Sequence, residues 1–267
     1  MLRILLSLMR INWLNYRPAD CLPYACFCET VSTGFIRQPI NAYTNLGYII
    51  VGILILIYLK KTSIEKSTTA AISGLPRKLL KLFGIAYIAV GIGSFIYHAS
   101  FIFLGEELDD DSMYMIAIFL VLFEAARIRK LSLRQFLWIY VLMNFAFEAI
   151  IYFFPVVRGG LFVFLMFVAL GIELVARRML SIYNEVRLTD HANLIFLAGY
   201  FFWILDKSHA FCYPNSFFQG HAIWHLLTAY AGWVMFKAMD TEYDKGARLI
   251  KDDDPFNVPL RKFYNQK

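Results

Sequence analysis

Two histidines stand four residues apart in the stretch FFQGHAIWHLLTAY, residues 217–230. This spacing places His221 and His225 on one face of a helix, where two imidazoles can bind one metal ion. The alternative is a pair of interfacial histidines that only hydrogen-bond to their neighbours. A third histidine, His98 in GIGSFIYHASFIFL, favours metal binding, because three histidines from two helices leave a tetrahedral Zn²⁺ with an open fourth position. Water in that position becomes hydroxide near neutral pH, as a catalytic site requires.

Polar residues around His98 could move protons. Ser94, one helical turn before His98, could donate a hydrogen bond to a developing oxyanion or orient the water, although most membrane serines bond back to their own helix. In the acidic run GEELDDD, residues 105–111, Asp109 and Asp110 are the candidates for the carboxylate that takes the proton of the water and passes it to a leaving group. The other acidic side chains of the run are expected to be solvated surface groups: Glu106, Glu107 and Asp111.

The composition indicates a membrane protein that holds these residues in place. With 59% hydrophobic residues and a mean hydropathy of +0.55, the chain is too apolar for a soluble domain of 267 residues. A helix needs roughly 20 residues to cross a bilayer. We therefore expect an all-α, seven-transmembrane helix bundle with spans at about Asn41–Leu59, Leu82–Leu104, Ser112–Ala126, Phe136–Phe154, Leu161–Ala176, Asn193–Leu205 and His221–Phe236.

The segments on either side of the bundle differ from it. In residues 1–40, Arg3, Arg10 and Arg17 interrupt the apolar positions, a pattern that predicts a short amphipathic helix at the membrane interface. A cleaved signal peptide is the rival interpretation of this segment. We assign residues 41–238 to the seven-helix domain that would carry the hydrolase chemistry, and residues 239–267 to a cytoplasmic tail.

The distribution of basic residues predicts the orientation of the bundle. With the N-terminus outside, 20 of the 26 Lys and Arg residues fall on the inner side and 6 on the outer side. The positive-inside rule therefore places the N-terminus outside, in the lumen or cell exterior, and the C-terminus in the cytoplasm. The net charge of +6 then reflects basic cytoplasmic loops and gives no reason to expect nucleic acid as a partner.

This orientation brings the three histidines to a similar depth, towards the outer leaflet. The four cysteines, Cys21, Cys26, Cys28 and Cys212, fall on the same side, where disulfides persist. Three complete pairings are open, and free thiols are the alternative.

Ionisable and amide side chains inside the predicted spans usually face the bundle interior. Glu148 could approach the metal cavity, whereas Glu124 could simply pair with Arg127. Glu173 also lies within a span. For three more residues we expect hydrogen bonds at helix ends or between helices: Asn41, Asn45 and Asp206.

Four separated pieces of the sequence resemble one family. They are CFCE followed by QPINAYTNLGY, then GIGSFIYHASFIFLGEELDDDSM, FFWILDKSHAFC and GHAIWHLLTAY. Together they resemble the alkaline ceramidases, within a wider group of seven-span metal-dependent membrane hydrolases related to the adiponectin-receptor-like proteins. The resemblance covers most of the chain from Cys26 to Tyr230.

The resemblance implies roles for named residues. Zinc would be held by His98, His221 and His225, with Ser94 and Asp109 completing the catalytic group. It also implies a disulfide between Cys28 and Cys212. Animal members of the family carry an acid-rich calcium site whose glutamate matches Glu29, a possible ligand of a second cation. Cys26 and Gln38 stand where further carboxylates are expected, which puts Ca²⁺ binding in doubt because a hard cation needs several charged oxygens.

The expected function is therefore that of an integral-membrane, zinc-dependent amidohydrolase that cleaves the N-acyl bond of ceramide-like lipids to a fatty acid and a sphingoid base. The alternative is a seven-span receptor-like protein whose metal site is structural. A transporter is disfavoured because no internal repeat or pair of broken helices is evident. The sequence does not indicate an oligomeric state.

Overall fold

The computed structural model describes residues 12–22, 26–62, 73–180, 186–241 and 243. These residues form helices and connecting loops and contain no β-strand, which confirms the predicted all-α class. The helices are η1 (Trp13–Asn15), α2 (Pro39–Thr44), α3 (Leu46–Lys61), η2 (Arg77–Leu79), α5 (Leu80–Ser100), α6 (Phe103–Arg129), α7 (Leu133–Phe153), η3 (Pro155–Val157), α8 (Arg158–Leu180), α9 (Val186–Lys207) and α10 (Gly220–Thr241).

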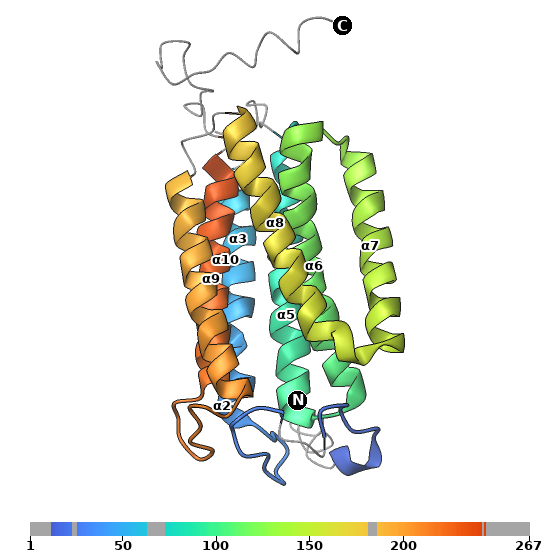
Figure 1. The fold of residues 1–267 in the computed structure, drawn as a ribbon, viewed down its shortest axis with the longest axis vertical. Helices are drawn as coiled ribbons and strands as arrows, with labels where there is room; N and C mark the ends of the chain where they lie inside the picture. Colours follow the sequence, from blue (N-terminus) through green and yellow to red (C-terminus); the bar gives the residue numbers. More distant parts are fainter. Residues whose placement is uncertain (1–11, 23–25, 63–72, 181–185, 242, 244–267) are drawn as a thin grey trace, which may run out of the picture.

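The long helices stand side by side along the long axis of the molecule (Figure 1). Helix α5 packs between α3 and α6, while α10 packs against both α9 and α3. Helix α6 also contacts α8 and α7, and α7 lies at the edge of the bundle. The two helices that carry the histidines, α5 and α10, are therefore central elements with neighbours on several sides.

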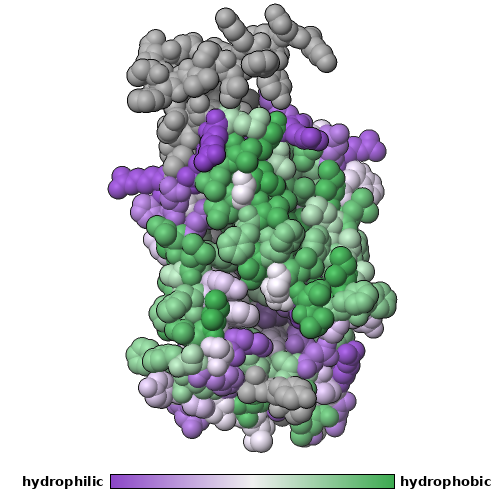
Figure 2. All heavy atoms as spheres, viewed as in Figure 1, coloured by the Kyte–Doolittle hydropathy of each residue, from purple (hydrophilic) through white to green (hydrophobic). Residues whose placement is uncertain are grey.

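The exterior of the bundle suits a bilayer. Figure 2 shows apolar side chains over the middle of one face, hydrophilic ones towards both ends, and hydrophilic atoms inside a hollow in its lower part. In the described part of the chain, five helical stretches are long and apolar enough to span a membrane: Pro39–Lys61, Arg77–Ser100, Leu133–Phe153, Pro155–Met179 and Arg187–Lys207. The chain is therefore a helical membrane protein. Helices α6 and α10 are as long but are not among these stretches, so the count of seven spans stays a prediction.

The prediction for the connection between the second and third spans was wrong. We expected the second span to reach Leu104 and the acidic run to link it to a third span that begins at Ser112. Instead α5 ends at Ser100, Phe101 adopts a left-handed φ of 51°, and α6 begins at Phe103. Acidic side chains are favoured in the first turns of a helix because of its dipole. The run is therefore the helical beginning of α6.

Close contact between α5 and α6 depends on a glycine. A Cβ atom at Gly93 would lie 2.4 Å from the backbone oxygen of Leu108, closer than real atoms approach. Only glycine lets the two backbones come this near without a shift. The contact places Ser94 beside Asp109, the next residue on each helix.

The flanking segments are only partly described. Residues 1–11, most of the predicted amphipathic helix, and residues 244–267 of the predicted tail lie outside the described residues. Helix α10 continues to Thr241, three residues beyond the predicted end of the membrane domain at residue 238. The described N-terminal residues run as a loop across the same end of the bundle as the histidines (Figure 1).

Candidate metal and catalytic site

The structure brings the three predicted histidines together. His98 comes from α5, and His221 and His225 come from one face of α10. Their candidate ligand atoms all lie within 4.8 Å of one another, and the Nε2 atoms of His98 and His221 are 3.1 Å apart. All three side chains are buried. Among the described residues this is the group of three or more side chains that could hold a metal ion.

Hydrogen bonds outside the cluster orient two of these rings. The Nδ1 atom of His225 lies 3.1 Å from the backbone oxygen of Asn41. A carbonyl oxygen only accepts, so Nδ1 carries the proton and Nε2 keeps the lone pair that a metal needs. His98 Nδ1 lies 3.0 Å from Oε1 of Gln38, which is also an acceptor. Both rings therefore offer Nε2 to the centre of the cluster.

His221 has a different environment. Its backbone N–H donates to Asp206 Oδ2 at 3.0 Å, and the ring of Phe27 lies 3.7 Å away between centroids. Its Nδ1 atom is buried with no hydrogen-bond partner among the described residues. A buried nitrogen without a partner is costly, and a metal ion bound at that nitrogen would relieve the cost. Three neutral imidazoles are a donor set that suits Zn²⁺.

Ser94 and Asp109 form a pair next to the histidines. The Ser94 hydroxyl donates a hydrogen bond to the Asp109 carboxylate. Both side chains are buried, and both line the same cavity as His221 and His225. The structure therefore places a carboxylate and a hydroxyl on one wall of the cavity and the imidazoles on another.

The cavity has a volume of about 660 Å³ and is open at one side of the bundle. A smaller cavity of about 50 Å³ adjoins it deeper in the bundle. The residues that line both are mainly apolar: Tyr48, Val90, Met113, Phe162 and Trp224. A polar reacting centre thus continues into an apolar space that could accept a hydrocarbon chain.

The acidic run contacts a cation that the sequence did not link to it. Arg158, the first residue of α8, lies 2.7 Å from Glu107, 2.9 Å from Asp110 and 3.4 Å from Glu106. Glu106 and Glu107 are only 7% and 6% exposed. The expectation that they are solvated surface groups was wrong, because Arg158 compensates their charge inside the protein.

The other acidic residue of the run, Asp111, and the three glutamates within the predicted spans also have polar partners. Asp111 shares a hydrogen bond with Glu148, and Glu148 does not line the cavity, so the expected approach of Glu148 to the metal site is not found. Glu124 pairs with Arg127 at 2.6 Å, as predicted. Glu173 pairs with Arg177.

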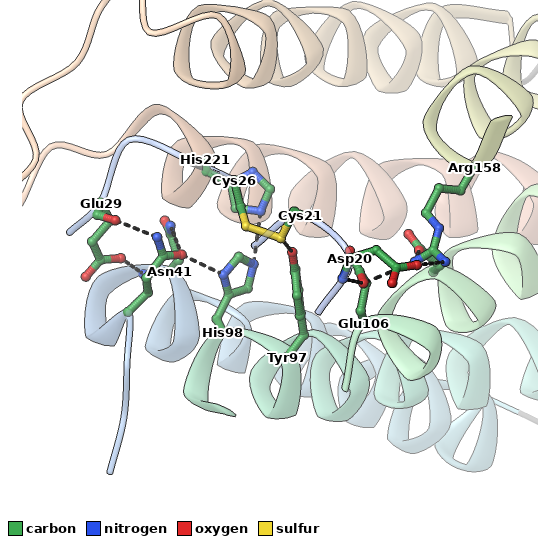
Figure 3. Close-up of a disulfide and its surroundings, with 12 residues drawn as sticks. Asp20, Cys21, Cys26, Glu29, Asn41, Tyr97, His98, Glu106, Arg158 and His221 are labelled. Carbon is green, nitrogen blue, oxygen red and sulfur yellow. Dashed lines mark hydrogen bonds and ion pairs between the residues drawn. A yellow bond between two sulfur atoms is a disulfide. The ribbon is translucent and has the colours of Figure 1, made fainter. Parts of the chain in front are cut away.

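One disulfide ties the N-terminal segment to the loop between α9 and α10, and a second lies within the segment. Cys28 pairs with Cys212, the pairing that the resemblance implied, and Cys21 pairs with Cys26. In Figure 3 the Cys21–Cys26 bridge lies between His221 and Tyr97. The Sγ atom of Cys21 is 2.9 Å from the Tyr97 hydroxyl. Phe27, which follows directly, covers the ring of His221 and lines the cavity.

Asp206 and Asn45 make the structural hydrogen bonds expected of them. Asp206 accepts from the backbone of Cys28 at 2.9 Å and from that of His221, so it connects the N-terminal segment to the start of α10. Asn45 donates to the backbone oxygen of Asn41 at 2.9 Å.

Glu29 uses both carboxylate oxygens within the protein. They accept the backbone N–H groups of Ile40 and Asn41, each at 2.8 Å. Figure 3 shows Glu29 beside Asn41. Burial raises the pKa of the Glu29 carboxyl, and the two backbone hydrogen bonds oppose that rise. A second cation at Glu29 would have to share these oxygens with the backbone.

Sequence reasoning missed several residues that surround the site. The sequence marks Gln38 only as a position where a carboxylate is expected, and nothing in it connects Arg158 to the acidic run. Their contacts join segments that are 60 and 51 residues apart in the chain. The one local signal for Gln38 is the proline that follows it, because proline is favoured at the first position of a helix.

The sequence was compared with curated proteins and with protein-family models. A search of curated proteins found no match. A family model described as Ceramidase matches residues 25–249, which include the three histidines, Ser94 and Asp109. The chain therefore belongs to the ceramidase family.

Proposed function

We propose that this protein is an integral-membrane, zinc-dependent amidohydrolase that cleaves the N-acyl bond of ceramide-like lipids to a fatty acid and a sphingoid base. Family membership implies hydrolysis of the ceramide amide bond. The observation that supports the metal dependence is the buried group of His98, His221 and His225 beside the cavity. Among the described residues the group has three members, which leaves a fourth position to water, as a hydrolase needs and a structural site does not.

Zinc, when bound by the three histidines, would polarise the amide carbonyl and lower the pKa of water. The other steps belong to the protein. Asp109 takes a proton as water attacks the carbonyl carbon, and returns it to the nitrogen as the C–N bond breaks. The products are a fatty acid and a free amine: one water is consumed, its hydroxyl goes to the carbonyl carbon and its other proton goes to the nitrogen, so the step balances.

The Ser94 hydroxyl donates a hydrogen bond first to Asp109 and later in the reaction to the substrate. While Asp109 is ionised, the Ser94 hydroxyl donates to it and fixes the direction of the carboxylate. Once Asp109 holds the proton, it no longer needs that donor. The hydroxyl can then turn to the developing oxyanion of the substrate and stabilise it.

The proposed orientation places this site towards the outer or lumenal leaflet, with the N-terminus on that side and the C-terminus in the cytoplasm. The 20-to-6 distribution of basic residues supports it. So does the position of the two disulfides, because disulfides persist in oxidising compartments and both lie at the histidine end of the bundle.

The direct test is incubation of the purified protein in detergent with a panel of N-acyl lipids that differ in backbone and chain length. Mass spectrometry should detect fatty acid and free sphingoid base released in equal amounts from ceramides. Release should stop when a chelator removes zinc and return when zinc is restored. Hydrolysis that survives complete removal of the metal would contradict the proposal.

A further inference from the structure

Gln38 is a fully buried glutamine between the N-terminal segment and the histidines. Its backbone N–H donates to the backbone oxygen of His98 at 3.0 Å. Its side-chain Nε2 donates to the backbone oxygen of Glu29 at 2.5 Å. Its Oε1 accepts from Nδ2 of Asn41 at 3.0 Å and lies 3.0 Å from Nδ1 of His98. Both ends of the amide are therefore engaged.

These partners determine which way the amide faces. The backbone oxygen of Glu29 can only accept, so the amide nitrogen of Gln38 must point towards it. The amide oxygen then points towards His98, whose Nδ1 must carry a proton in order to donate to it. Nε2 of His98 is left with its lone pair, 3.1 Å from Nε2 of His221. One amide thus selects the tautomer that can bind a metal.

The position of Gln38 is itself held by the start of α2. The Glu29 carboxylate accepts two N–H groups from the first turn of this helix, while the Glu29 backbone oxygen receives the Gln38 amide. Three residues after Gln38, the backbone oxygen of Asn41 receives the Nδ1 proton of His225. The start of α2 therefore provides hydrogen-bond acceptors for two of the three histidines.

We propose that Gln38 is a positioning residue for the metal centre: its side-chain oxygen fixes the tautomer and ring direction of His98 and thereby raises the affinity for zinc. It contacts no substrate and acts only through His98. The inference rests on the proposed zinc-dependent function and adds a residue to it. A neutral amide performs this task with no added charge in the buried cluster.

The test uses Gln38→Leu, which keeps most of the side-chain volume and removes the acceptor. The dissociation constant for zinc is measured on the purified protein in detergent by competition with a chromophoric chelator. Loss of an outer hydrogen bond to a metal-ligating histidine typically weakens metal binding about 10- to 100-fold, and we expect a loss in that range. The melting temperature of the metal-free protein is measured in parallel.

Gln219→Leu is the matched control. Gln219 is also buried, at the same end of the bundle, and its Nε2 donates to the backbone oxygens of Tyr213 and Ser216. Within the described part of the chain, none of its side-chain hydrogen bonds involves a histidine. This variant should lower the melting temperature while zinc affinity stays within about twofold of the original, since the outer contacts of the histidines are intact.

Gln38→Glu distinguishes a role of Gln38 in positioning His98 from a role in stability alone. It keeps an oxygen opposite Nδ1 of His98 but loses the donor to Glu29, so it should lower the melting temperature and yet bind zinc at least as tightly as the original protein. Zinc affinity that falls with the melting temperature in both Gln38 variants would overturn the inference. If Gln38→Leu does not fold, a tenfold or greater loss of affinity in Gln38→Glu would overturn it.

The zinc measurements distinguish an error in the role of Gln38 from an error in the proposed function. Zinc bound by the original protein and held equally well by Gln38→Leu contradicts the role of Gln38 alone. Absence of zinc binding in the original protein contradicts the zinc-dependent function, and the role of Gln38 with it.

Discussion

Asp109 and Asp110 are adjacent and chemically identical, yet their contacts assign them different tasks. Asp110 lies 2.9 Å from the guanidinium of Arg158, which stabilises its charged form. Asp109 accepts a hydrogen bond from the neutral hydroxyl of Ser94 and forms no ion pair with any of the described residues. A carboxylate that has to gain and lose a proton during each turnover should not be held by a strong cation. Asp109 is therefore the proposed proton shuttle.

Asp109→Asn should retain zinc, because all three histidines remain, and should lose about 10²- to 10⁴-fold in turnover. Asp110→Asn is the neighbouring control and should lose much less, since its effect is confined to the contact with Arg158. Lipid hydrolysis and bound zinc are measured on the same preparations. Unchanged turnover in Asp109→Asn would show that the shuttle is assigned wrongly.

His225→Ala should lose most bound zinc, because two ligands hold the ion far less firmly than three. His191→Ala is a suitable control, since His191 is exposed and its Nδ1 contacts only a backbone oxygen in α9. Elemental analysis of the two purified variants provides the measurement. Full zinc occupancy in His225→Ala would exclude the three-histidine site.

Glu29 predicts a pH dependence of stability. Its pKa is raised from 4.5 in the folded protein by burial, so the folded state binds this proton more tightly than the unfolded state. The resulting stabilisation is fully present below pH 4.5 and is lost as the pH rises through the folded pKa.

The contribution of Glu29 can be isolated by comparison with Glu29→Gln, which has no carboxyl to titrate. The melting temperature of the original protein minus that of the variant should fall as the pH rises above 4.5. A difference that stays constant or increases over this range would contradict the assignment.

At the scale of the helices, the contact between α5 and α6 brings Ser94 and Asp109 together. Gly93→Ala would force the two backbones apart and should cost about 1–3 kcal/mol of stability. The hydrogen bond between Ser94 and Asp109 should weaken with it, so turnover should fall as well.

Gly171→Ala in α8 is the control, because a Cβ there meets nothing within 4 Å. Alanine has the higher helix propensity, so this variant should be neutral or slightly more stable. Thermal unfolding and lipid hydrolysis of both variants provide the comparison. Gly93→Ala with unchanged stability and turnover would show that the close contact is not needed.

The helices differ in how well the sequence predicts them. Long apolar runs are recognisable by composition alone, and the structure has a helix at each of the predicted spans. The helix break at Phe101 was not predictable from the sequence. Phe101 has a positive φ, which a bulky residue rarely adopts, so this backbone conformation depends on the surrounding structure. The helical acidic run was missed for a similar reason, since its charges depend on Arg158.

The residues of the site also differ in how well the sequence predicts their arrangement. The spacing of His221 and His225 predicts that they share a helical face, because this depends only on a short stretch of sequence. The hydrogen bond between Gln38 and His98 depends on how α2 meets α5, and no short stretch of sequence contains that information.

At the scale of the whole molecule, the orientation in the membrane can be tested directly. The distribution of basic residues predicts that tags inserted after Thr68 and at the C-terminus are cytoplasmic, and that a tag before Leu2 is external. Protease protection in sealed membranes distinguishes the two sides. Both termini on one side would contradict a bundle of seven spans.

The disulfide between Cys28 and Cys212 joins residues 184 positions apart, and this separation has a consequence for biosynthesis. At about 5–20 residues per second, the ribosome adds Cys212 roughly 10–40 seconds after Cys28. During this interval the thiol of Cys28 waits near Cys21 and Cys26, which can already pair with each other across five positions. His221 and His225 are made later still, so the nascent chain cannot assemble the proposed metal centre, or hydrolyse the lipids around it, until α10 has been synthesised.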